Sequence, residues 1–93
     1  MFSSTVQITT TNPSRLIRRL CKHWGHKFEV SFDDQQGNIA LGDDHCQLTA
    51  GEGSLTAVVK SAEEAKLERL QTVVADHLQR MSSDESFTFN WTR

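Results

Sequence analysis

Apolar residues recur at every second position in six short segments of the chain, with polar residues between them. This spacing is typical of strands that bury one face, because successive side chains of a strand point to opposite sides. In the first segment, for example, Val6 and Ile8 alternate with Thr5, Gln7 and Thr9. The six predicted strands lie at about residues 1–10, 28–32, 39–41, 46–48, 55–59 and 87–91.

Two other segments have the three-to-four-residue spacing of amphipathic helices. Asn12-Pro13 predicts the start of the first helix, with Asn as the N-cap, and the apolar spacing continues to about His26. The second helix is predicted over about 62–81, and Ser61 with Glu64 forms a capping box at its start. The apolar stripes consist of Leu16, Ile17, Leu20 and Trp24 in the first helix, and of Leu67, Leu70, Val73, Val74, Leu78 and Met81 in the second.

The four strands predicted between the helices are joined by short turns, which favours an antiparallel meander. We expect a turn over residues 34–38, in which Gly37 is available for a positive φ. The outward-facing residues of the strands are polar, so that face of the sheet needs no cover. We therefore predict an α+β fold, a two-layer sandwich with a largely antiparallel sheet (β-α-β-β-β-β-α-β) and two helices on one face. The 93 residues are expected to form a single domain, 1–93.

The N-terminal segment predicts no secretory signal, because it has neither a basic region nor an apolar core. No apolar run reaches the roughly 18 residues that a membrane span needs, so no membrane partner is expected. The expected compartment is the cytoplasm, where Cys21 and Cys46 should be reduced thiols.

The charge balance argues against a dedicated nucleic-acid-binding protein, because the net charge is −2. Stacking on bases would also need exposed aromatic side chains. The alternation of the strands instead predicts a core-facing position for the aromatic residues Phe28, Phe32, Phe87, Phe89 and Trp91. We therefore expect no nucleic-acid partner.

Half of the basic residues lie in and just after the first helix. They occupy the face opposite the apolar stripe, so they should be exposed together and could attract an anionic partner. The candidate binding residues are Arg15, Arg18, Arg19, Lys22, His23 and His26. Such a surface suits an anionic small molecule, a metal chelate or a protein partner. The alternative is a solvated helix face whose cations pair with nearby acids.

The segment from Cys21 to Lys27 also raises the question of a transition metal such as iron, copper or zinc, because thiolate and imidazole are suitable ligands. At about 100° per residue, Cys21 and His23 point roughly 160° apart on a regular helix. His23 and His26 are three residues apart and could share a ligand. A metal site therefore needs His77 or Cys21 to approach His23, and the alternative is a core thiol beside surface histidines.

His77 lies within the apolar stripe of the second helix. A buried imidazole needs a partner for each ring nitrogen. His77 could serve as a ligand or as the general base of a small enzyme, or it could be a core histidine bonded to a backbone carbonyl. No catalytic motif or phosphate-binding loop is present, so we favour a non-enzymatic binding or accessory protein.

Two segments, Leu20–Phe28 and Val74–Arg80, together with Trp91 near the end of the chain, resemble a bacterial family of short proteins, domain-of-unknown-function family 2218. The resemblance covers nearly the whole chain. In some chains a similar domain is joined to a siderophore-interacting flavin reductase, which implies a link to iron handling and a flavin reductase as a partner. The resemblance implies no catalytic residues, but it adds interest to His23, His26 and His77.

Overall fold

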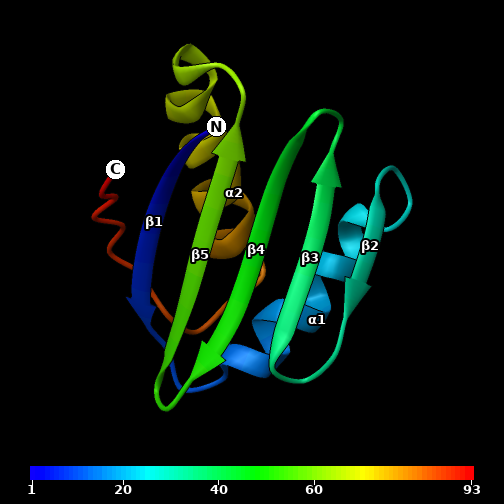
Figure 1. Cartoon of the computed structure of the whole chain (residues 1–93). Helices are drawn as coiled ribbons and strands as arrows, with labels where there is room; N and C mark the ends of the chain where they lie inside the picture. The colour runs from blue at the N-terminus through cyan, green and yellow to red at the C-terminus, as the bar shows by residue number, and fades with distance from the viewer.

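The computed structural model describes residues 1–93 and has an α+β fold, as the sequence predicts (Figure 1). Five strands form one sheet, and two helices cover one of its faces. In chain order the elements are β1 (Phe2–Thr9), α1 (Pro13–Trp24), β2 (Glu29–Phe32), β3 (Gln36–Leu41), β4 (Asp44–Gly51), β5 (Ser54–Ser61), a short 3-10 helix η1 (Glu64–Lys66) and α2 (Leu67–Arg80).

All neighbouring strands in the sheet are antiparallel, in the order β1-β5-β4-β3-β2. The predicted meander is therefore confirmed, and β1 joins it at the edge of β5. Helix α1 packs on β2, β3 and β4, whereas α2 packs on β5 and β1. The two helices thus lie next to each other on the same side of the sheet (Figure 1). Neither helix is long and apolar enough to cross a membrane.

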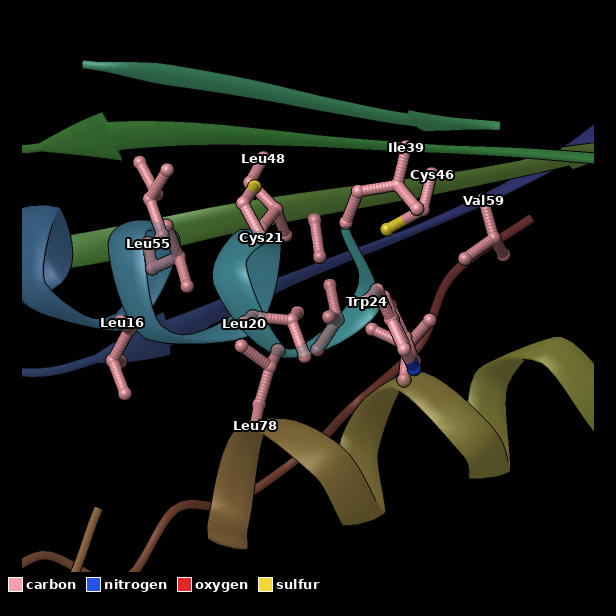
Figure 2. Packing of buried hydrophobic residues seen from close by; sticks show 14 of the residues in the cluster. Leu16, Leu20, Cys21, Trp24, Ile39, Cys46, Leu48, Leu55, Val59 and Leu78 are labelled. Carbon is pink, nitrogen blue, oxygen red and sulfur yellow. The ribbon is translucent and has the colours of Figure 1, made fainter. Parts of the chain in front are cut away.

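The hydrophobic core lies between the sheet and the helices. Leu20 and Trp24 of α1 lie between the strands and α2, with Leu78 of α2 facing them (Figure 2). From the sheet, Ile39 and Leu48 reach the same cluster and are fully buried. Burying a side chain of this size stabilises the folded protein by about 1.5–3 kcal/mol. This cluster therefore fixes how the helices lie on the sheet.

The structure corrects the prediction for Gly37, which lies within β3 and not in a turn. The turn before it is closed by Asp33, whose Oδ1 accepts hydrogen bonds from the backbone N–H groups of Gln35 and Gln36, both at 2.8 Å. The glycines with positive φ are Gly42 and Gly53. Glycine is needed at position 37 for another reason, because α1 crosses the strand there: a Cβ would lie 2.9 Å from the Cys21 thiol.

The predicted start of α1 is confirmed, because Asn12 is its N-cap residue and Pro13 its first residue, although the Asn12 side chain makes no capping hydrogen bond. The predicted cap of the second helix is wrong. The Ser61 hydroxyl accepts a hydrogen bond from the Glu63 backbone N–H, but Glu64 gives no return bond, so the capping box does not form. Regular helix starts only at Leu67, which is the first buried residue after Ser61.

The last predicted strand does not form a ladder. The chain after α2 passes beside β1 as an irregular segment and pairs with it only at Thr5 and Thr92 (Figure 1). Phe87, Phe89 and Trp91 still pack against the core from this segment, as their alternation predicts. Among the aromatic residues expected in the core, Phe32 is the exception, because it is 42 % exposed at the end of the edge strand β2.

Candidate functional site

The outer face of α1 carries cations that have no acidic partner in the protein. Arg15, Arg18 and Lys22 are all exposed, and the only ion pair in the chain joins Lys66 to Glu63 at 3.0 Å. The alternative interpretation of this helix, a face neutralised by nearby acids, therefore does not describe the structure. These three residues, defined here as the α1 cationic face, are free to meet an external anion.

Arg19 has a different role from its neighbours. Its Nη1 donates a hydrogen bond to the carbonyl oxygen of Met81 at 2.8 Å. Met81 is the C-cap residue of α2, and a cation at a helix C-terminus is favourable because unpaired carbonyls point there. Arg19 thus holds the two helices together. It also borders an open hollow of about 560 Å³ along the first turns of α1, which is lined by Thr11, Asn12, Pro13, Ser14, Arg15, Arg18, Arg19 and Lys22.

His23 and His26 border a second hollow, near the end of α1, that shares no lining residue with the first. Helix α1 ends at Trp24, so His26 lies in the turn that follows it and not in the helix. The ring of His23 lies 5.5 Å from the ring of His77 in α2, measured between centroids. The six residues predicted to form one anion-binding surface are therefore divided between two surfaces.

The His77 ring is held in one orientation. Its Nδ1 lies 2.7 Å from the backbone oxygen of Val73, and since a carbonyl only accepts, this nitrogen carries the proton. The ring also packs against Trp24, with centroids 4.9 Å apart. The half-buried His77 thus has the backbone bond expected of a core histidine, yet its Nε2 remains available for another partner.

His23, His26 and His77 all border one hollow of about 730 Å³ between the end of α1 and the side of α2. We call this the interhelical hollow. Its lining consists of His23, Trp24, His26, Lys27, Phe28, Arg69, Val73 and His77. No carboxylate belongs to this set, and neither Lys27 nor Arg69 forms an ion pair.

Lys27 and Arg69 were not predicted as site residues. Arg69, Val73 and His77 follow at intervals of four residues, so one stripe along α2 carries all three. This spacing was the signal available in the sequence. The approach of that stripe to the end of α1 comes from the packing of the helices, which no local pattern reveals.

Cys21 does not lie with the histidines. Its side chain is fully buried and faces Gly37 of β3, as the opposite directions of residues 21 and 23 on a helix require. Burial raises the pKa of the Cys21 thiol to about 11 and that of the buried Cys46 thiol to about 12. Nowhere in the chain do three or more His, Cys, Asp or Glu side chains come together in a group that could hold a metal ion.

Comparisons with known proteins agree with this fold. The chain is similar over 99 % of its length to PA4090 from Pseudomonas aeruginosa, whose NMR structure is solved, with 44 % identity, a TM-score of 0.84 and 96 % of that chain covered. The search of curated proteins finds no match. The model of a family described as an uncharacterized protein conserved in bacteria (DUF2218) matches residues 5–92. The chain therefore belongs to this bacterial family, DUF2218.

Proposed function

We propose that the protein is a non-enzymatic binding domain that docks on the acidic surface of a partner protein through the α1 cationic face. The observation that carries this proposal is that Arg15, Arg18 and Lys22 are exposed together without any acidic partner. Side chains engaged in internal ion pairs would have to break those pairs before binding, whereas these three do not.

The spacing of the cations favours a protein surface over a single small anion. Arg15 and Lys22 are seven residues apart, which corresponds to roughly 10 Å along a helix. One small anion cannot contact both ends of such a row, but a row of carboxylates on a partner can. Exposed charges of this kind mainly accelerate and orient association, with smaller effects on affinity. A partner should therefore bind with a strong dependence on salt.

A flavin reductase of the siderophore-interacting type is the first partner to test, because the resemblance noted above implies that association. Iron handling enters this proposal only through that partner. The domain would then act as an accessory to the reductase, with no chemistry of its own.

The experiment is an NMR titration of the labelled protein with a deca-glutamate peptide, and then with such a reductase. Shifts should concentrate on Arg15–Lys22 and should weaken between low and physiological salt. The variant R15E/R18E/K22E should lose the response. A matched control, K66E/R80E/R93E, changes the net charge equally at exposed positions elsewhere and should keep it. If both triple variants lose binding equally, only net charge matters and the proposed face is wrong.

A further inference from the structure

We propose that the interhelical hollow is a binding pocket for a small aromatic carboxylate. This site is separate from the α1 cationic face, since the two hollows have no lining residue in common. Its volume of about 730 Å³ falls within the range of roughly 300–1,000 Å³ that is usual for small-molecule sites.

The floor of the pocket is apolar and aromatic. Trp24 lies beneath the hollow and is only 5 % exposed, so most of the accessible aromatic surface comes from the half-buried Phe28, whose ring Trp24 meets edge-on with centroids 6.4 Å apart and an interplanar angle of 84°. Val73 adds a half-buried aliphatic side chain from α2. Aromatic rings favour offset or edge-to-face contact with other rings. A planar ring entering the hollow would therefore find suitable surfaces, which a phosphate or another compact anion would not use.

The rim of the pocket is cationic. Lys27 comes from the turn after α1 and Arg69 from α2, and both are exposed and free of carboxylates. A guanidinium presents two parallel N–H groups that match the two oxygens of a carboxylate. The other polar side chains that line the hollow are three imidazoles, which add no negative charge. An aromatic ring on the floor and a carboxylate at the rim would thus each meet complementary groups.

The pocket is also held in shape before any ligand arrives. The His77 ring is fixed on one side by its bond to the Val73 carbonyl and on the other by packing on Trp24. His23 lies next to it across the junction of the helices. A site whose side chains are already ordered loses less entropy on binding.

A metal ion fits the same residues less well. Of the three imidazoles at the hollow, only His23 and His77 have closely placed rings, and no third ligand completes a group. Zinc sites in proteins use three or four protein ligands. The apolar floor and the cations Lys27 and Arg69 have no use in a metal site, and two nearby cations repel a metal ion. The complete lining therefore favours an organic anion.

The test is an NMR titration with 2-naphthoate that follows the indole N–H of Trp24 and the histidine rings. Two compounds separate the contributions: 2-naphthalenemethanol keeps the ring without the charge, and acetate keeps the charge without the ring. We expect 2-naphthoate to bind at this site and both other compounds to bind at least about tenfold more weakly. Equal binding of 2-naphthalenemethanol would overturn the assignment of an anion.

Variants then locate the site. Arg69 is exposed, so R69Q should fold normally, and it should weaken 2-naphthoate binding by about tenfold or more, the size expected for losing one charge-assisted contact. R80Q, on the same helix but outside the hollow, should bind like the wild type. R15E/R18E/K22E should also retain 2-naphthoate, which separates this proposal from the docking of a partner. No response at Trp24, or an unchanged affinity of R69Q, would show that the pocket does not bind this class of ligand.

Discussion

Gly37 of β3 lies directly beneath the thiol of Cys21 in α1. A Cβ at position 37 would lie 2.9 Å from the Cys21 Sγ and 3.1 Å from the Cγ2 of Ile17. A contact of 2.9 Å is essentially never found for a real Cβ and one of 3.1 Å is tight, so the Cys21 side chain, the helix or the strand would have to shift. The absence of a side chain at Gly37 thus sets how closely α1 approaches the sheet.

Replacing Gly37 with alanine should therefore destabilise the protein by about 1–3 kcal/mol, the usual cost of overpacking a core. Urea unfolding measures the change in the free energy of unfolding. The partner variant is C21A, which removes the sulfur atom that the new Cβ would meet. In the double variant G37A/C21A part of the loss should return, because the clash is relieved. Strictly additive losses would contradict a direct contact between the two positions.

The two buried thiols should make the protein less stable at alkaline pH. Burial raises the pKa of Cys21 from an ordinary value of 9.0 to about 11, and burial also raises the pKa of Cys46 to about 12. Below pH 9 both the folded and the unfolded protein keep the thiol protons, so the thiols do not change the free energy of unfolding. Between pH 9 and about 11 the unfolded chain releases them while the folded protein does not, so the free energy of unfolding falls as pH rises.

Urea unfolding at pH 8, 9 and 10 checks this dependence. The variant C21A/C46A isolates the thiols from other groups that titrate in the same range, such as lysines. Its free energy of unfolding should fall less steeply from pH 9 to pH 10 than that of the wild type. Parallel curves for the two proteins would show that the thiols do not cause the loss.

Glu85 anchors the C-terminal segment to the beginning of α1. Its Oε2 accepts a hydrogen bond from the Thr10 hydroxyl at 2.8 Å, and its Oε1 accepts one from the Thr11 backbone N–H at 3.0 Å. Thr10 is buried, so removing the acceptor leaves its hydroxyl without this partner. We expect E85A to cost about 1–3 kcal/mol of unfolding free energy.

The matched control for E85A is D84A, one residue earlier. The Asp84 carboxylate is exposed and accepts a bond only from the hydroxyl of Ser82. Its loss should change stability by no more than about 0.5 kcal/mol. Hydrogen exchange at the Thr11 amide gives a local measurement and should accelerate in E85A alone. Equal effects of the two variants would mean that net charge, and not the anchor, matters.

The fold could be predicted because almost every strand and helix has one buried face and one exposed face. In β5, Leu55, Ala57 and Val59 are all buried, as their alternation indicates. Predictions failed where a distant contact decided the conformation. The local pattern predicts a turn at Gly37 because glycine is common in turns, whereas the close approach of α1 is what requires glycine there.

The start of α2 shows the limit of a local motif. Ser61 and Glu64 have the spacing of a capping box, yet residues 62–66 are all exposed and Leu67 is the first to be buried. An isolated helical turn is marginal without packing, so the regular helix begins where burial begins. The interhelical hollow escaped prediction for a related reason. Lys27 and Arg69 are distant in sequence, and only the packing of α1 beside α2 brings them to the same surface.

The paired rings of His23 and His77 lead to a last prediction, which concerns metal ions. Because these two imidazoles have no third ligand nearby and Cys21 faces the core, we expect no stoichiometric iron, copper or zinc in protein purified without an affinity tag. Native mass spectrometry with elemental analysis measures this directly. Added zinc should bind weakly and should be lost in H23A/H26A, whereas H45A, which removes a histidine of β4, should not alter it. A tightly retained metal that H23A/H26A releases would instead make the interhelical hollow a metal site and would contradict its assignment to an organic anion.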